Sequence, residues 1–518
     1  MTLADLVPLP TVLPLLGAGI ALFLAGRVRA QTTVSVVTLA AVAVVNVVLL
    51  FGVDAAGTQV MAVGGWELPF GIALVVDRLS ALMLVVASVV TLAVFVYAVG
   101  QEMTDTNRDS PVSVFNPAYL ILCAGVFNAF LAGDLFNLYV GFEMLLGASY
   151  VLLTLGATEA RIRAGATYIV VSLVSSIVFL AAIGLVYGAT GTVNMAQLSQ
   201  RLDALPADVQ MILHVAILLG FGIKAAVFPL SFWLPDSYPT APAPVTAVFA
   251  GLLTKVGIYA IIRTETVLFF ESSLRTPLMI VALATMIVGI LGAVAQSEIK
   301  RMLSFTLISH IGYMLFGVSL GTEAGLTAAI IYTVHHIVVQ TALFLAAGLL
   351  EQRTGTTSVR RMGSLLVLAP GLSLLFLLPA LNLAGIPPFS GFIGKVALFR
   401  SGVETGDWLV YVLIGGGALT SLLTLYAIGK AWNLGFWREA ADAEEPNRDL
   451  VAQSRGEQET PSTPWLMTSS TTAVVALSVA LTVLAGPLWE YSARAAENMR
   501  GPNTYIANVV DHEGASKG

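Results

Sequence analysis

Long apolar stretches separated by short polar connections repeat along the whole chain. A membrane-spanning helix needs about 20 mostly apolar residues, and by that measure the sequence predicts fourteen spans. They begin near Leu3, Val34, Leu74, Phe115, Leu135, Ala164, Val209, Val245, Pro277, Leu303, Leu326, Leu365, Trp408 and Thr471. We expect the amino end to be the first span and not a signal peptide, because it lacks a positively charged start and a small-residue cleavage site.

Two of the apolar stretches are interrupted. The run from Gly220 to Gly257 contains five prolines, the first at Pro229, and it carries Lys224 and Lys255 near its ends. Proline lacks a backbone N–H and breaks a regular helix. Irregular backbone at membrane depth is tolerated only inside protein or beside a wet cavity, where transporters build ion sites. The pattern favours ion translocation.

The second interruption lies in the stretch from Leu365 to Arg400. As one helix it would rise about 54 Å, against about 30 Å of hydrocarbon. Gly385, Pro387, Pro388 and Gly391 mark the expected break, and Lys395 follows it. Paired interruptions are typical of transporters built from inverted repeats.

The predicted fold is therefore an all-α polytopic membrane protein with two inverted five-helix repeats, each containing a Pro/Gly-broken helix. We divide the chain into residues 1–114 (helices one to three), 115–264 (first repeat), 265–437 (second repeat), 438–470 (a flexible polar cytoplasmic loop) and 471–518 (helix fourteen and tail). Composition agrees, since 57% of residues are hydrophobic and 11% charged, with a mean hydropathy of +0.87.

Orientation follows from the positive charges in loops. Loops after odd-numbered helices hold fourteen Lys and Arg residues, including Lys300, and those after even-numbered helices hold five, including Arg263. This predicts odd loops in the cytoplasm and both termini outside it.

Seven titratable residues fall inside spans and are the candidate ion-translocation site: Glu143, Lys224, Lys255, His310, His335, His336 and Lys395. His214, close to a helix start, is a weaker candidate. We expect every other ionisable residue to lie at an interface. An ammonium at the bilayer centre is costly, so intramembrane lysines indicate function.

The chemistry that these residues offer is proton transfer. A buried lysine becomes easier to deprotonate when unpaired and regains its charge when a carboxylate approaches, so Glu143 beside Lys224 or Lys255 suits a proton carrier. Histidine donates and accepts near neutral pH and suits a relay between lysines. The structural alternatives are a static ion pair for Glu143, a Lys255 that extends to the interface, and hydrogen-bonded core histidines.

Several functions are not indicated. The sequence has no phosphate-binding G-x-x-x-x-G-K-[ST] loop for ATP, and its single cysteine, Cys123, excludes a CxxC metal or iron–sulfur site. The two adjacent histidines lack carboxylate or thiolate neighbours, so no metal site is predicted. We expect no cofactor, and the net charge of −6 spread over loops indicates no nucleic-acid role.

The runs IKAAVFPLSFWLPDSYPTAPAPVTAVFAGLLTKVG, EIKRMLSFTLISHIGYM and AGIPPFSGFIGKVALF resemble the antiporter-like subunits shared by respiratory complex I, membrane-bound hydrogenases and Mrp-type cation/proton antiporters. The first run is similar to the D-type branch of the Mrp proteins. The resemblance covers helices four to thirteen. It implies a glutamate on helix five, lysines on helices seven and eight, and a lysine or glutamate on broken helix twelve.

Glu143, Lys224, Lys255 and Lys395 match that pattern, and His335 and His336 match its helix-eleven histidine region. Gln340 stands where many relatives have a lysine. The resemblance implies a sodium/proton antiporter subunit in a bacterial inner membrane, working with Mrp subunits A, B, C, E, F and G. The alternatives are a proton-pumping subunit of a redox complex and a scaffold that transports nothing.

Overall fold

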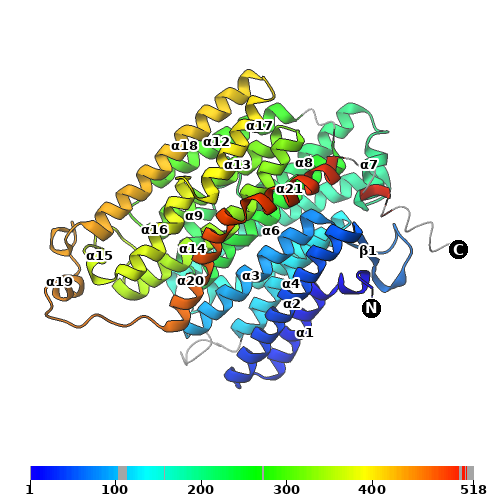
Figure 1. Ribbon diagram of the computed structural model, residues 1–518. Coiled ribbons are helices and arrows are strands. Elements are labelled where there is room, and N and C mark those ends of the chain that lie inside the picture. The colour runs from blue at the N-terminus through cyan, green and yellow to red at the C-terminus, as the bar shows by residue number, and fades with distance from the viewer. Residues whose placement is uncertain are drawn as a thin grey trace.

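The computed structural model describes residues 2–102, 114–156, 158–270, 274–500, 505–507 and 509, and it is a bundle of roughly aligned helices (Figure 1). Residues 103–113, near the end of the first predicted segment, and residues 510–518, at the end of the predicted tail, lie outside the described part of the chain. The first half contains α1 (Leu9–Phe23), α2 (Val28–Ala56), β1 (Gln59–Ala62), β2 (Ala73–Val76), α3 (Arg78–Gly100), α4 (Phe115–Leu131), α5 (Leu135–Thr154), α6 (Glu159–Thr190), α7 (Met195–Leu202), α8 (Ala207–Ala225), α9 (Leu234–Ser237), α10 (Ala243–Val248) and α11 (Thr254–Arg263).

The second half contains α12 (Arg275–Val294), α13 (Ile299–Ser319), α14 (Glu323–Thr354), α15 (Leu365–Leu368), α16 (Pro370–Ala384), α17 (Ser390–Val403), α18 (Trp408–Trp432), α19 (Arg448–Ser454), α20 (Trp465–Val483) and α21 (Ala485–Arg500). Twelve helices among the described residues are long and apolar enough to cross a membrane, and Phe115–Leu131 and Pro370–Ala384 are shorter apolar helices. The all-α polytopic fold is confirmed, whereas the two inverted repeats stay a prediction.

Some elements differ from the sequence prediction. The third span begins at Arg78 and not at Leu74, because Ala73–Val76 pairs with Gln59–Ala62 in a two-stranded antiparallel sheet. Asp77 then caps α3 by accepting a hydrogen bond from the Ser80 N–H at 2.9 Å. The short helix α7 and the helix α21 after the last span were not predicted.

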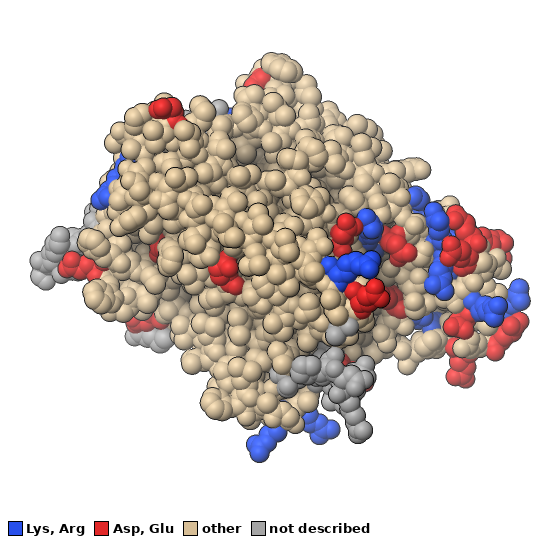
Figure 2. All heavy atoms as spheres, turned by 180° about the vertical axis from the view of Figure 1, so that it is seen from behind, with Lys and Arg blue, Asp and Glu red and all other residues tan. Residues whose placement is uncertain are grey.

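The helices differ in how much protein surrounds them. The apolar stretches of α14 and of the continuous helix Ala243–Leu268 are entirely buried inside the protein. In α2, by contrast, only 28% of the apolar stretch is buried. Figure 2 shows one broad face that is mostly free of charged side chains, which gather mainly toward its edges. A lipid-facing belt around a few central helices explains this distribution, because an uncharged surface is what hydrocarbon requires.

Both expected interruptions are breaks in the backbone. Helix α8 ends at Ala225, the left-handed Ala226 turns the chain, and the irregular segment with Pro229 leads to α9. Helix α16 ends at Ala384, the left-handed Gly385 turns the chain, and Pro387 and Pro388 precede α17. Gly391 lies in the first turn of α17, where an added Cβ would come within 2.0 Å of the Asn382 carbonyl oxygen.

The polar loop after α18, predicted to be a flexible connector over 438–470, contains the short helix α19. Its helix α19 begins at a cap in which Asn447 accepts from the Asp449 N–H, and the Asn447 amide donates to the Thr354 carbonyl at 2.9 Å. Helices α20 and α21 then lie across α14 and α3 (Figure 1). The loop is thus attached to the end of a central helix.

Candidate ion-translocation site

Glu143, Ser176 and Lys224 form one hydrogen-bonded chain contributed by α5, α6 and α8. The Lys224 ammonium donates to Ser176 Oγ at 3.3 Å, and the Ser176 hydroxyl donates to Glu143 Oε1. Lys224 is buried, and its Nζ lies 4.8 Å from the centre of the Phe142 ring. The carboxylate and the ammonium expected to pair are therefore linked through one hydroxyl, which the sequence pattern did not indicate.

A small cavity adjoins Lys224 at the first helix break. Its volume is about 20 Å³, and the residues that line it include Phe142, Trp233 and Leu253. That space is close to what one water molecule needs. Trp233 closes it from the broken segment by donating its indole N–H to the Ile223 carbonyl at 3.2 Å. Leu253 lies two residues before Lys255, so the cavity reaches from Lys224 toward the helix of the second lysine.

Lys255 is enclosed by protein on all sides. It is 0% exposed, and its ammonium donates to the Ala250 carbonyl at 2.5 Å. Ala250 belongs to the π-helical turn Phe249–Leu253, which directly precedes α11. Such wide turns occur frequently at functional sites. Lys255 therefore does not extend to the interface, and no carboxylate contacts its ammonium among the described residues.

His310 on α13 and His336 on α14 lie side by side, with ring centres 5.4 Å apart. His310 Nδ1 is 2.8 Å from the Tyr332 hydroxyl, and its Nε2 is 3.4 Å from Thr424 Oγ1. Neither nitrogen of His336 has a hydrogen-bond partner among the described residues. Both imidazoles are 0% exposed. The Lys395 ammonium lies 5.1 Å from the centre of the Tyr313 ring, and that ring lies 5.5 Å from the His310 ring.

His335 and Lys395 meet the second helix break. His335 Nδ1 lies 2.9 Å from the Ser390 hydroxyl, and Asn382 Oδ1 accepts from that hydroxyl at 3.3 Å and from the Gly391 N–H at 2.9 Å. The Lys395 ammonium donates to the last carbonyls of α16, at 3.1 Å to Leu383 and 2.9 Å to Ala384. A helix C-terminus favours a cation, so the break itself creates the site for this ammonium.

Gln340 lies on α14 about one turn beyond His336 and is 0% exposed. Its amide donates to the Leu303 carbonyl at 2.8 Å, whereas its Oε1 has no partner among the described residues. Gln340 is thus a fixed, uncharged bridge to α13.

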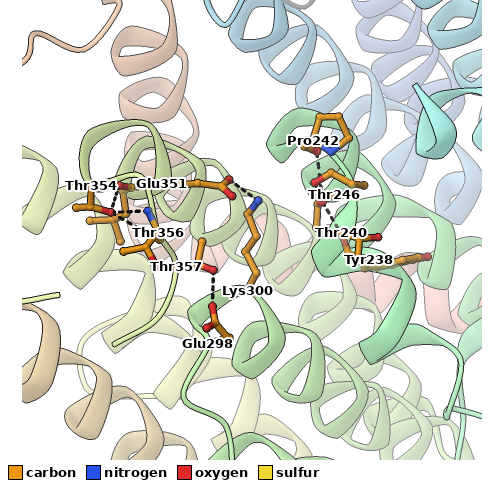
Figure 3. Close-up of polar contacts among 12 residues, drawn as sticks. Tyr238, Thr240, Pro242, Thr246, Glu298, Lys300, Glu351, Thr354, Thr356 and Thr357 are labelled. Atoms are coloured by element: carbon orange, nitrogen blue, oxygen red, sulfur yellow. Dashed lines mark hydrogen bonds and ion pairs between the residues drawn. The ribbon is translucent and has the colours of Figure 1, made fainter. Parts of the chain in front are cut away.

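The expectation that every other ionisable residue lies at an interface is wrong. Arg263, assigned to a loop, is in α11 and forms a buried two-bond ion pair with Asp77, 2.6 Å at each contact. Burial alone would raise the pKa of Asp77, but Arg263 and the Ser80 hydrogen bonds hold it below its ordinary value. Lys300, also assigned to a loop, is buried in α13 and pairs with Glu351 (Figure 3).

His214 is another residue whose surroundings differ from the sequence prediction. It lies well inside α8, buried, with Nε2 2.5 Å from Glu265 Oε1 and its ring stacked on Phe269 at 4.1 Å. This geometry pairs it with Glu265, which is not one of the seven candidate residues. Among the described residues, no group of three His, Cys, Asp or Glu could hold a metal ion.

Sequence signals existed for two of the missed residues. Arg263 follows Lys255 and Tyr259 at steps of four, which places all three on one face of a helix. Ser172, Ser175 and Ser176 also share one face of an otherwise apolar helix. Hydroxyls and charges repeating on a single face would have indicated that α6 and α11 turn polar sides toward the protein interior.

A model of a known protein family matches more than half of this chain. A family model described as "NADH:quinone oxidoreductase/Mrp antiporter, TM" matches residues 132–424, which include all seven candidate residues. A second, "NADH-Ubiquinone oxidoreductase (complex I), chain 5 N-terminus", matches residues 61–100.

Individual relatives match nearly the full length. The D subunit of the Na(+)/H(+) antiporter of Alkalihalophilus pseudofirmus is 38% identical over 98% of this chain and 99% of its own length. A chain in the structure of the Mrp complex from Dietzia sp. DQ12-45-1b is 33% identical, with a TM-score of 0.89 over 98% of this chain and 100% of that one. A chain of an archaeal membrane-bound sulfane sulfur reductase shares the fold, with a TM-score of 0.84 over 98% of this chain and 99% of that one at 24% identity.

Proposed function

Because the chain belongs to the NADH:quinone oxidoreductase/Mrp antiporter family, with D-type antiporter relatives along its full length, we propose that it carries protons as one subunit of a sodium/proton antiporter. It is a multi-pass membrane protein of the transporter kind and works with other subunits. We further propose a proton route through the chain, the ion that is exchanged for protons, and the identity of the partner subunits.

The observation that carries the proposal is the chain from Lys224 through Ser176 to Glu143 beside a broken helix. A hydroxyl can pass a proton by accepting one and donating another. Here the acid, the Lys224 ammonium, donates to the Ser176 hydroxyl, which donates to the base, the Glu143 carboxylate. Because Lys224 is buried and Glu143 is partly buried, movement of either partner changes the charge that the other can hold. Glu143 thereby biases Lys224.

From Lys224 the route runs laterally to Lys255, through His310, His335 and His336, to Lys395. The small cavity supports the first step, because it adjoins Lys224 and includes Leu253 in its lining. The imidazole nitrogens without protein partners among the described residues support the middle steps, since they keep donor and acceptor capacity available. The carbonyls of Leu383 and Ala384 support the last step, where they hold the ammonium of Lys395.

The coupled ion is Na⁺ or another monovalent cation, and the partners are Mrp subunits A, B, C, E, F and G in a bacterial inner membrane. The relatives' names and the Dietzia complex support this assignment. The distribution of Lys and Arg in the loops supports an orientation with α19 in the cytoplasm and both termini outside.

Flux measurement in vesicles tests the function. Sodium-driven proton flux is measured with the assembled complex, and we expect Lys224→Ala and Glu143→Ala each to abolish exchange while assembly is unchanged. Lys430→Ala is the matched control, because Lys430 donates to two backbone carbonyls, of Val294 and Gln296, at and just beyond the end of α12. Wild-type flux in either site variant would remove that residue from the route, and loss of assembly in all lysine variants would instead favour a scaffold.

A proton-pumping subunit of a redox complex is the second candidate, favoured by the family description that includes NADH:quinone oxidoreductase. The visible spectrum of the purified assembly separates the two. Flavin or iron–sulfur absorbance from partner subunits would establish the redox complex, whereas we expect a colourless sample.

A further inference from the structure

A buried ammonium outside the lysine route lies at the end of the molecule that carries α19. Lys300 is in the first turn of α13, and its ammonium pairs with Glu351 in the last turn of α14 (Figure 3). The Lys300 side chain is 6% exposed, whereas that of Glu351 is 43% exposed. The buried ammonium thus has a counter-ion that water can reach.

Other contacts also hold these two helix ends together. The Ile299 N–H donates to the Thr357 carbonyl and the Val359 N–H donates to the Ser297 carbonyl, both at 2.9 Å. The Thr357 hydroxyl donates to the Glu298 carboxylate at 2.6 Å. Burying an ammonium beside a membrane-spanning bundle is costly, so a lysine that is not needed to join the helices points to function.

Polar side chains continue from this ion pair toward the buried histidines. On α14, Glu351, Gln340 and His336 fall within about 60° of one another at 3.6 residues per turn, so they share one face. On α13, Ser304 lies one turn beyond Lys300. Gln340 donates at 2.8 Å to the carbonyl of the residue before Ser304, which brings its amide to that level. The two helices therefore carry polar groups at three successive levels between water and the imidazoles.

We propose that Lys300 and Glu351 form a proton port, through which His310 and His336 exchange protons with water at the α19 end. The inference rests on the proposed function, because it names a further entry point to the same route. Lysine suits the task, since its flexible four-carbon stem lets the ammonium turn from the carboxylate toward the Ser304 level.

The transfer through the port takes three steps. A proton from water binds the Glu351 carboxylate and neutralises it. The Lys300 ammonium has then lost its counter-ion in a buried place, so it releases a proton toward His336. The Glu351 carboxyl group passes its proton to the Lys300 amine that results. One proton has moved from water to an imidazole, and both port residues have regained their charges.

Deuterium exchange at the histidine rings tests the port separately from transport. The C2 proton of a histidine ring exchanges with heavy water through the protonated ring, and mass spectrometry with peptide fragmentation assigns the exchange to His310 and His336. In the assembled, detergent-purified complex, we expect Lys300→Arg to slow this exchange at least about tenfold, because arginine keeps the ion pair but does not release its proton. Glu351→Gln removes the group that takes up the proton and should slow the exchange by a similar factor.

Three further variants keep the test decisive. Glu298→Gln makes the same chemical change at the start of the same helix, and its amide oxygen can still accept from the Thr357 hydroxyl, so exchange should be unchanged. Lys430→Arg repeats the lysine change at a residue that donates to two backbone carbonyls, and it should also be neutral. Glu351→Asp keeps the carboxylate and should retain most of the exchange, which covers the case in which Glu351→Gln does not assemble.

The outcomes separate the port from the proposed function. Wild-type exchange in Lys300→Arg, equal slowing in Glu298→Gln, or no exchange at either histidine in the wild type would overturn the port. Sodium-driven proton flux is measured on the same complexes, and Lys300→Arg should lower it at least about tenfold. If the wild type showed no such flux while Lys300→Arg still slowed the ring exchange, the proposed function would fail and the port would stand.

Discussion

The two broken helices hold lysines by different means. At the first break Lys224 reaches a carboxylate, Glu143, through the Ser176 hydroxyl. At the second break Lys395 is held by the carbonyls of Leu383 and Ala384. A carboxylate can itself take up the proton, whereas carbonyl dipoles can only stabilise an ammonium. The same backbone device therefore creates an acid–base pair in one half and a single cation site in the other.

The region between the breaks has neither the acid–base pair of the first break nor the helix-end cation site of the second. The Lys255 ammonium donates to the Ala250 carbonyl, and the neighbouring imidazoles of His310 and His336 lie in a buried helix pair. A charge here has fewer compensating groups among the described residues than at either break, so protons are expected to pass through it and to reside mainly at its ends.

The largest expected effect comes from replacing lysine with arginine at both breaks. Arginine keeps its charge and its hydrogen bonds to hydroxyls or carbonyls, but it does not release its proton. Lys224→Arg and Lys395→Arg should each lower proton flux at least about 100-fold, measured in vesicles with assembled complex. Lys430→Arg serves as the control and should be active. Normal flux in Lys395→Arg alone would mean that the second break holds a fixed charge, which would sharpen the difference between the halves.

The next effect is on stability and involves a residue outside the route. Asp77→Asn leaves Arg263 buried without its counter-ion, which should cost about 3–5 kcal/mol and reduce the yield of assembled complex. The double variant Asp77→Asn with Arg263→Gln should recover much of that yield. The yield of assembled complex is measured by size-exclusion chromatography of detergent extracts. If Asp77→Asn assembled normally but lost flux, the ion pair would belong to the proton route.

A smaller effect is expected at the hydroxyl that links the lysine of the first break to its carboxylate. Ser176→Ala removes the link between Lys224 and Glu143 and should lower flux by about tenfold, as expected for one charged hydrogen bond. Ser175→Ala is the neighbouring control, because Ser175 donates to the Gly220 carbonyl at 3.4 Å. Equal flux in both variants would show that the carboxylate and the lysine communicate without the hydroxyl.

The smallest effect concerns the loop before α5. Burial raises the pKa of Asp134 to about 6, and the Asp134 carboxylate caps α5 by accepting from the Asn137 N–H at 2.6 Å. An acid with a raised native pKa costs stability as it ionises, so stability should fall between about pH 4 and 6 and then level off. Asp134→Asn keeps a good helix cap but cannot ionise. The fall in melting temperature between about pH 4 and 6 should therefore be about 2–3 °C smaller in this variant than in the wild type. Asp407→Asn, at an exposed cap, should leave the change as it is.

Much of the fold was predictable because it depends on composition and on breakers of helices. Apolar length located the spans, and the proline and glycine clusters located both breaks, since these residues act on their own local backbone. The small sheet at Gln59–Ala62 and Ala73–Val76 was not predictable from apolar length, because β2 reads as the start of the following span.

The candidate site was predictable as a set of charges but not as a set of contacts. An intramembrane lysine is conspicuous in sequence, whereas the partner of a lysine depends on which helix face lies opposite it. Ser176 is an ordinary residue in membrane helices, and only packing of α6 against α8 gives it a role. Arg263 was misplaced because charge near a helix end looks like a loop until its buried partner, Asp77, is located 186 positions away.

Proton flux through a complex with Lys255→Met tests the central claim most directly. Methionine keeps most of the length of the side chain and removes its charge and proton, and neither helix break is altered. Flux is measured per assembled complex in vesicles, with Lys430→Met as the control. If buried ammonium groups form one continuous route between the two breaks, Lys255→Met will fall to the background of empty vesicles, while the control exchanges normally. Wild-type flux in Lys255→Met would contradict the account.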